Sequence, residues 1–194
     1  MLPVFLKLVV ITGCSGGGKS TLVAELKNRG YWTVPEPGRI IVKEALASGS
    51  DLTPWQRPID FCAAIIQRGI ADYQEKQALC ASQESQYCFF DRCFLDAISY
   101  FQTLTRPDAH QYDHLISSMR FCPLVFMVPP WHDIYCQDEE RKHSLTEAMV
   151  EYERLLAFYP QNGYQVVEVP KASVAERIDF ILVKLKVMES RYEK

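Results

Sequence analysis

Short apolar runs alternate along the chain with longer stretches in which apolar residues recur at helical spacing. The runs predict strands at 4–12, 31–35, 87–91, 124–128 and 164–169. The intervening periodic stretches predict helices at 19–28, 37–48, 53–82, 95–104 and 112–119, and helices opening at Ser144 and Ser173. Buried strands that alternate with helices are typical of a parallel sheet covered on both faces. The fold expected is therefore an α/β three-layer sandwich with a five-stranded parallel sheet.

Length and composition narrow the class of protein. A chain of 194 residues with 48% hydrophobic and 23% charged residues predicts one globular domain over 1–194. The net charge is -3, and the lysines and arginines are scattered, so nucleic acid is not expected as a partner. Seven cysteines without a C-x-x-C pair indicate free thiols in a reducing, cytoplasmic setting.

The apolar start of the chain has two interpretations. Residues 11–14 resemble a lipoprotein cleavage box, but a signal peptide carries its positive charge ahead of the apolar stretch, and Lys7 lies inside it. The run is also too short to span a bilayer. A buried strand is the better explanation, and no membrane association is expected.

A phosphate-binding loop follows that first strand. Residues 13–20 read GCSGGGKS and match G-x-x-x-x-G-K-[ST] between a predicted strand and a predicted helix. Backbone N–H groups of such a loop surround phosphate oxygens at the positive end of the helix. The predicted ATP ligands are Gly13, Cys14, Ser15, Gly16, Gly17, Gly18, Lys19, Ser20 and Thr21. Lys19 is expected to contact the β- and γ-phosphates, and Ser20 to bind Mg²⁺. The alternative is a flexible glycine turn, which would not require Lys19 and Ser20 at these offsets.

Acidic residues stand at the ends of two further strands. Asp91 is predicted to hold Mg²⁺ with Ser20, and Arg92 to contact a phosphate; an ordinary surface Asp–Arg pair is the alternative. Asp96 is a lesser candidate for this acidic site and is expected instead to be a solvated residue of a first helical turn. Glu36 ends the second strand, where a capping or surface role is the alternative to catalysis. Because ligands of parallel sheets bind at the carboxyl ends of the strands, these residues are expected in one crevice.

A family resemblance rests on these motifs. Glu36-Pro37 and Asp91-Arg92 resemble motifs of deoxynucleoside and thymidylate kinases. With the phosphate loop, residues 138–141 and residues 169–177, the chain resembles, over nearly its full length, the compact AAA-type ATPase domains that group with ribosylnicotinamide kinase. The resemblance implies that Glu36 accepts a hydrogen bond from the acceptor hydroxyl and serves as its base. It also makes Arg39 and Arg92 candidate acceptor ligands.

Residues 131–143 occupy the place of a lid in the kinases resembled. Phosphoryl transfer needs positive charge at the γ-phosphate and exclusion of water, which makes Arg141 the best candidate there. The alternative is a solvated charge run. Five aromatic residues on helices are candidates for an acceptor pocket or for the core: Trp55, Phe61, Tyr73, Tyr100 and Phe101.

Two functions fit this pattern. The first is a kinase that transfers the γ-phosphate of ATP, with Mg²⁺, to a small nucleoside-like or nucleotide-like acceptor. The second is a switch that hydrolyses nucleotide slowly. The absence of an N/T-K-x-D segment disfavours a Ras-like GTPase, and Arg92 after Asp91 disfavours a ring-forming AAA+ motor, whose Walker B usually carries a second acid there.

Overall fold

The computed structural model describes residues 3–82, 87–105, 109–131 and 145–192. Its strands are β1 (Leu8–Gly13), β2 (Trp32–Val34), β3 (Cys88–Asp91), β4 (Leu124–Val128) and β5 (Gln165–Glu168). Its α-helices are α1 (Lys19–Asn28), α2 (Pro37–Ser48), α3 (Pro58–Ser82), α4 (Phe94–Leu104), α5 (Asp113–Ser118), α6 (Leu145–Gln161) and α7 (Val174–Tyr192). The 3-10 helices are η1 (Val4–Lys7) and η2 (Ala109–Tyr112). All strand pairs are parallel, in the order β2-β3-β1-β4-β5. The predicted five-stranded parallel α/β fold is confirmed.

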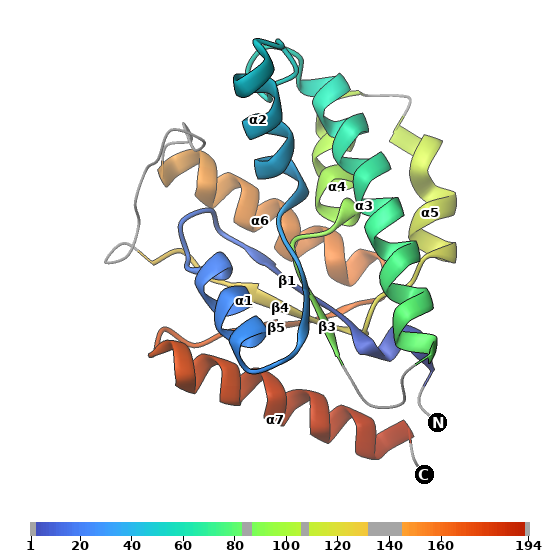
Figure 1. The fold of residues 1–194 in the computed structure, drawn as a ribbon, viewed down its shortest axis with the longest axis vertical. Coiled ribbons are helices and arrows are strands. Elements are labelled where there is room, and N and C mark those ends of the chain that lie inside the picture. Colours follow the sequence, from blue (N-terminus) through green and yellow to red (C-terminus); the bar gives the residue numbers. More distant parts are fainter. Residues whose placement is uncertain (1–2, 83–86, 106–108, 132–144, 193–194) are drawn as a thin grey trace.

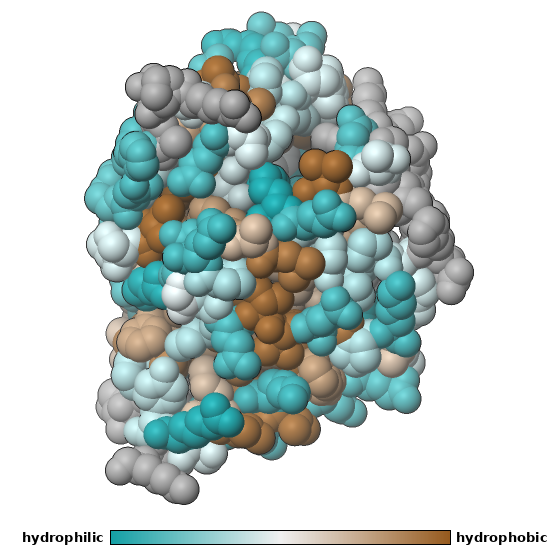
Figure 2. Space-filling view, turned by 180° about the vertical axis from the view of Figure 1, so that it is seen from behind, coloured by the Kyte–Doolittle hydropathy of each residue, from teal (hydrophilic) through white to brown (hydrophobic). Residues whose placement is uncertain are grey.

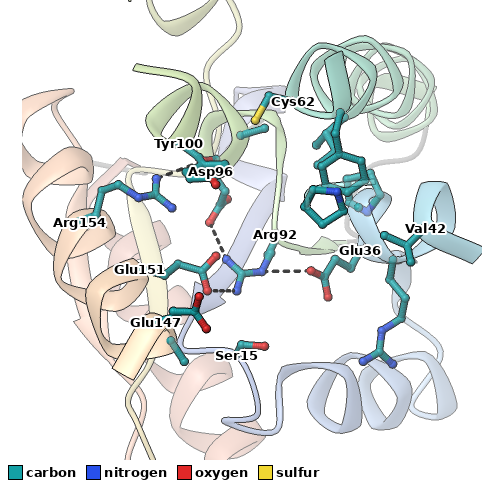
Figure 3. Close-up of a pocket in the computed structure, with 18 of the residues that line it drawn as sticks. Ser15, Glu36, Val42, Cys62, Arg92, Asp96, Tyr100, Glu147, Glu151 and Arg154 are labelled. Atoms are coloured by element: carbon teal, nitrogen blue, oxygen red, sulfur yellow. Dashed lines mark hydrogen bonds and ion pairs between the residues drawn. The ribbon is translucent and has the colours of Figure 1, made fainter. Parts of the chain in front are cut away.

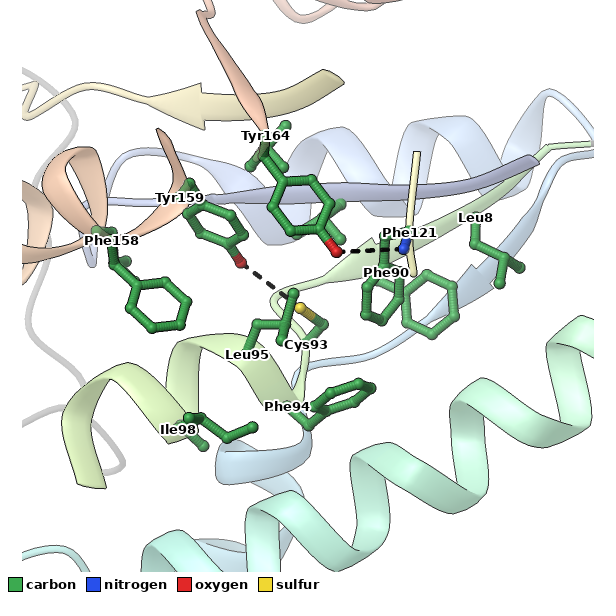
Figure 4. Packing of buried hydrophobic residues seen from close by; sticks show 14 of the residues in the cluster. Leu8, Phe90, Cys93, Phe94, Leu95, Ile98, Phe121, Phe158, Tyr159 and Tyr164 are labelled. Atoms are coloured by element: carbon green, nitrogen blue, oxygen red, sulfur yellow. Dashed lines mark hydrogen bonds between the residues drawn. The ribbon is translucent and has the colours of Figure 1, made fainter. Parts of the chain in front are cut away.

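Two apolar clusters fix the three layers. Successive side chains of a strand point to opposite faces of the sheet, and β1 shows the consequence. Leu8 and Val10 pack on one face with residues of α3, α4 and α6, including Phe94 (Figures 1 and 4). Val9 and Ile11 pack on the other face with residues of α1 and α7. Because both faces are covered, every residue of β1 is buried.

The register of the strands brings the predicted site residues to one edge. Ile11 of β1 pairs with Asp91 of β3, and Val34 of β2 pairs with Phe90. Gly13 pairs with Val128 at the end of β4. The residues that follow β1, β2 and β3 therefore leave the sheet side by side.

Two predicted boundaries are wrong. Residues 4–7 form η1 instead of the start of a strand, because a tight turn at Pro3 is closed by the Leu6 N–H donating to the Pro3 carbonyl at 3.0 Å. The long helix starts at Pro58 instead of Thr53. A proline has no N–H to donate to the carbonyl four residues earlier, so Pro58 disfavours a helix continued from Thr53, although it is suited to open a new one.

The cysteines that the structure describes lie in the interior of the protein. Six of the cysteines are described, and all six are free and buried. Among the described helices none is long and apolar enough to cross a membrane. On the face shown in Figure 2, hydrophobic areas are interrupted by hydrophilic side chains. The helix expected from Ser144 begins at Leu145, but Ser144 itself lies outside the described residues.

We expect Gly69→Ala to destabilise the fold, although alanine normally favours a helix over glycine by about 0.5–1 kcal/mol. Gly69 lies where α3 meets α4, and a Cβ there would be 2.9 Å from the Phe94 Cβ and 3.2 Å from its backbone nitrogen. Backbone cannot move aside cheaply, so we expect a loss of about 1–3 kcal/mol in the free energy of unfolding. Urea denaturation followed by circular dichroism measures it.

Gly38→Ala is the matched control, because its added Cβ meets side chains and no backbone: the flexible Cδ1 end of Ile65 at 3.2 Å, and Phe61 Cζ at 3.6 Å. Equal unfolding free energies for both variants would contradict the close approach of α3 to α4.

Candidate active site

The phosphate loop joins β1 to α1, and its glycines have a steric cause. Gly13 has a φ of 115°, and a Cβ there would lie 2.3 Å from the Val128 carbonyl oxygen. Gly16 and Gly18 also have positive φ, of 78° and 83°. The Cys14 N–H donates to the Val128 carbonyl at 2.9 Å, which ties the loop to the end of β4. The loop is thus held in a shape that only glycine permits at these positions.

Lys19 is folded into the loop that precedes it. Its side chain is 3% exposed, and Nζ donates to the Cys14 carbonyl at 2.8 Å and the Gly13 carbonyl at 3.3 Å. Burial, followed by the neighbouring charge of Arg92, lowers the pKa of Lys19 to about 8. A buried cation that donates to backbone carbonyls has lost its hydration without gaining a full negative charge in return. A bound phosphate would supply that charge, so this environment suits a phosphate-binding residue.

Ser20 and Asp91 form the pair predicted to bind a metal ion. The Ser20 hydroxyl donates to Asp91 Oδ2 at 2.8 Å. Asp91 is buried, and its Oδ1 has no hydrogen-bond partner among the described residues. Burial and the nearby Glu36 charge raise the pKa of Asp91. An orphaned carboxylate oxygen beside a hydroxyl fits a hard divalent cation, which takes oxygen ligands and would favour the ionised carboxylate. The described residues contain no group of three or more His, Cys, Asp or Glu side chains placed for a metal.

Arg92 is the most heavily paired side chain of the site. Nε lies 3.3 Å from Glu36 Oε1, Nη1 lies 3.6 Å from Asp96 Oδ1, and Nη2 lies 2.8 Å from Glu151 Oε2. Nη2 also donates to the Gly13 carbonyl at 3.0 Å. Burial alone would lower the pKa of Arg92, but Glu151, Glu36 and Asp96 outweigh it and raise the pKa. The alternative of an exposed surface pair is wrong for Asp91 and Arg92, because both side chains are buried.

The backbone at Arg92 is also unusual. Its φ is 61°, a left-handed conformation that non-glycine residues rarely adopt. The Arg92 N–H donates to the Ile11 carbonyl at 2.9 Å, so the turn after β3 stays fastened to β1. Strained backbone of this kind persists where surrounding contacts determine it, and the ion pairs of the guanidinium supply those contacts.

A cavity of about 460 Å³ opens beside this cluster (Figure 3). Ser15 of the phosphate loop, Glu36 and Arg92 stand on its wall, with residues of α2, α3, α4 and α6. Its apolar lining comprises Pro37, Val42, Pro54, Phe61, Ile65, Ala97, Ala148 and Val150. The volume and the mixed lining are typical of a small-molecule site. A second cavity, of about 530 Å³, shares Glu36 and Arg39 with the first and reaches Ser20 and Asp91.

The expectation for Asp96 is wrong. Its side chain is buried, and Oδ2 accepts hydrogen bonds from the Cys93 N–H at 3.0 Å and the Tyr159 hydroxyl at 2.9 Å, while Thr12 donates to Oδ1. Cys93 and Asp96 also form a capping box at the start of α4. Asp96 lies four positions after Arg92, but Arg92 precedes α4, so the helical spacing rule gave no signal for the pair.

The other predicted site residues differ in whether they line the two cavities. Arg39 lines both cavities and is half-buried, whereas Thr21 is exposed on α1. Of the aromatic candidates, Phe61 and Tyr100 line the first cavity, Tyr73 and Phe101 belong to the buried core, and Trp55 is 40% exposed. Arg141 and nearly all of the expected lid lie outside the described residues.

Two charged residues of α6 were missed by the sequence analysis. Glu151 pairs with Arg92, and the Arg154 side chain donates to the Ser99 hydroxyl at 2.5 Å and lies over the Tyr100 ring. The signal was present, because Glu147, Glu151 and Arg154 recur at helical spacing beside the apolar stripe of α6. The capping box at 144–147 and the apolar stripe predict this helix, but neither assigns a partner to its charged residues.

Comparison with solved structures finds the same fold in P-loop kinases. Deoxyadenosine kinase from M. mycoides matches with a TM-score of 0.60 at 20% identity, over 93% of this chain and 99% of that one. Thymidylate kinase from Candida albicans matches with a TM-score of 0.60 at 14% identity, over 94% and 92%. NadR protein in complex with NAD and AMP-PNP matches with a TM-score of 0.61 at 22% identity; the match covers 90% of this chain and 48% of NadR. At these identities the likeness shows the fold alone.

Sequence comparison places the chain in a family. No curated protein matches it at a significant level. The model of an AAA domain family, AAA_28, matches residues 8–177, from the first residue of β1 to a residue in the first turn of α7. This match spans most of the chain and includes every described site residue discussed above. The chain therefore belongs to the AAA_28 family of AAA domains, and it has the fold of a P-loop nucleotide kinase.

Proposed function

We propose that this protein is an ATP- and Mg²⁺-dependent phosphotransferase that phosphorylates a hydroxyl group of a small nucleoside-like acceptor. The observation that carries the proposal is the cavity of about 460 Å³ beside the phosphate loop, with the Glu36 carboxylate on its wall. Slow hydrolysis requires room for a water molecule only. A cavity of this size next to the loop suits a second substrate.

On the nucleotide side, three residues act on the polyphosphate. Lys19 would exchange its contacts with loop carbonyls for contacts with phosphate oxygens. Ser20 and Asp91 would hold Mg²⁺, which neutralises charge on the transferring phosphoryl group. ATP is preferred over GTP in this proposal, because the chain has no N/T-K-x-D segment.

On the acceptor side, Glu36 is the proposed base. The acceptor oxygen attacks the γ-phosphorus, the bond from that phosphorus to the ADP oxygen breaks, and the hydroxyl proton passes to the Glu36 carboxylate. Arg92 acts as a positioning residue, because its Nε lies 3.3 Å from Glu36 Oε1. With Glu151 and Asp96 already paired to Arg92, a direct phosphate contact by Arg92 would require these pairs to change.

The charges of the cavity favour an acceptor without a phosphate group. Among the described residues, the ionisable lining has one more acid than base: Glu36, Asp96, Glu147 and Glu151 against Arg39, Arg92 and Arg154. An acceptor phosphate would bring negative charge into a lining that already has an acidic surplus. Such juxtaposition disfavours binding, so we infer a neutral or cationic acceptor with an apolar ring stacked near Tyr100.

Three parts of the proposal rest on the sequence. Residues 131–143 would serve as the lid, with Arg141 at the γ-phosphate, and Arg39 would contact the acceptor. We further propose that residues 1–194 act as one catalytic unit in the cytoplasm. The motifs that resemble those of small-molecule kinases support the lid and the acceptor contact, and the buried free thiols fit a reducing compartment.

We expect Lys19→Ala to weaken ATP binding about 10- to 100-fold, because a buried charged hydrogen-bond donor to phosphate is lost. Isothermal titration calorimetry measures the affinity, with circular dichroism to check the fold. Lys27→Ala on the exposed part of the same helix is the control. Affinity equal to that of the control would remove the basis for ATP binding at this loop.

We expect Asp91→Asn to raise the Mg²⁺ concentration needed for half-maximal ATP turnover, while metal-free nucleotide binding changes little. An amide cannot supply the negative oxygen that Mg²⁺ prefers. Turnover is measured over a Mg²⁺ titration, with the exposed Asp60→Asn as control. An unchanged Mg²⁺ dependence would place Asp91 outside the metal site.

We expect Glu36→Gln to lower acceptor phosphorylation about 100-fold, the low end of general-base effects, because a loose phosphoryl-transfer transition state makes little demand on the base. ATP affinity should stay near that of the wild type. The assay uses labelled ATP and a panel of nucleosides, nucleoside monophosphates and cationic ribosides. Within the panel, we expect the unphosphorylated compounds to be the better acceptors.

Glu44→Gln is the matched control, since Glu44 is an exposed residue of the same helix region and pairs with Arg68. Equal transfer by wild type and Glu36→Gln would contradict the role of Glu36. Hydrolysis without transfer to any member of the panel would favour the switch over the kinase.

A further inference from the structure

Arg177 of α7 makes an unusual contact with the phosphate loop. Its side chain is 2% exposed, and Nη2 donates to the Gly17 carbonyl at 3.0 Å across 160 positions of sequence. We propose that Arg177 is a positioning residue of the nucleotide site, which orients the peptide between Gly17 and Gly18 and adds positive charge behind the loop. This inference rests on the proposed function, because it needs a polyphosphate bound at the loop.

The orientation follows from peptide geometry. A trans peptide is planar, so the N–H of Gly18 points away from the carbonyl of Gly17. By holding that carbonyl towards α7, Arg177 directs the Gly18 N–H to the opposite side of the loop. Backbone N–H groups turned in this way are the phosphate ligands of such loops. Without an anchor, a peptide between two glycines is free to rotate.

The end of β4 leaves little room for the peptide to shift. A Cβ on Gly17 would lie 2.6 Å from Val128 Cγ1 and 3.0 Å from the Pro129 carbonyl oxygen. Gly17 is thus pressed against the end of β4 while its carbonyl is held by α7. Both contacts together leave one orientation for the Gly17 carbonyl.

The charge of Arg177 is the second reason to connect this residue with a bound polyphosphate. Arg92 meets three carboxylates, whereas no described carboxylate pairs with Arg177, and its Nε has no hydrogen-bond partner among the described residues. A buried cation without a counter-charge is costly to the folded protein. An anion on the inner side of the loop would offset that cost, and a polyphosphate is the ligand that the loop is built to hold.

Trp131 keeps the guanidinium in place. The Arg177 guanidinium carbon lies 5.6 Å from the centre of the Trp131 ring, and guanidinium groups stack favourably on such rings. Trp131 follows β4 and the Pro129-Pro130 pair. The same guanidinium therefore joins α7, the phosphate loop and the chain that leaves β4.

The test compares Arg177→Met with wild type by calorimetry with ATP and with inorganic tripolyphosphate. Methionine keeps an apolar stem but loses the charge and the hydrogen bond, and we expect affinity for both ligands to fall about tenfold or more. Lys184→Met is the matched control, because Lys184 is an exposed α7 cation that lies 5.3 Å from the Phe180 ring. Titrations are run at a temperature at which circular dichroism shows the variants folded.

Arg177→Lys separates positioning from packing. It keeps the charge but lacks the planar fork, so we expect an affinity between those of wild type and Arg177→Met. If Arg177→Met does not fold, the Lys variant decides. Wild-type affinity for both ligands in the folded Arg177 variants would overturn this inference while leaving the proposed function intact. Failure of wild type itself to bind ATP would overturn both.

Discussion

The site depends on the buried ion cluster around Arg92. One guanidinium contacts the carbonyl that begins the phosphate loop, Glu36 beyond β2, Asp96 in α4 and Glu151 in α6. These elements are far apart in the sequence, and apolar packing alone is non-directional and would not fix the positions of their ends. Breaking one partner out of a buried cluster leaves an uncompensated charge, so the cluster fixes these ends more sharply than its net contribution to stability suggests. The left-handed φ of Arg92 is a strain that this arrangement sustains.

The cluster can form because the parallel sheet places Arg92 and Glu36 at the same edge. Strands that are apolar on both faces must be covered on both faces, and parallel strands then end together at one side. Arg92 follows β3 directly, and Glu36 lies two residues beyond β2. The polar residues stand where the apolar pattern stops. The apolar strands predict the sheet, and the polar residues just beyond their ends form the site. One alternating sequence pattern therefore determines both the fold and the position of the site.

The sequence predicted the elements that are encoded locally. The bounds of α1, α2 and β4 are those expected, because periodicity and the glycine or proline residues at their ends act over a few positions. What it could not predict is which polar residues become buried. Asp96 looked like a first-turn residue exposed to water, and its burial depends on Tyr159 from α6 and Thr12 from β1. The pairing of Glu151 with Arg92 likewise depends on the packing of α6 on the sheet. Two local signals were interpreted wrongly, the turn at Pro3 and the helix start at Pro58.

The two sides of the crevice differ in their charge balance, and this difference bears on function more than the fold does. Kinases of many acceptors share this fold, so the fold alone does not select one. On the loop side, Lys19 and Arg177 are buried against backbone carbonyls, and both give up hydration for partners weaker than an anion. On the cavity side, the described carboxylates outnumber the described cations by one. A polyphosphate would lower the energy of the first side, and an acceptor phosphate would raise that of the second. In the proposed function, the first side would hold the nucleotide and the second an acceptor without a phosphate group.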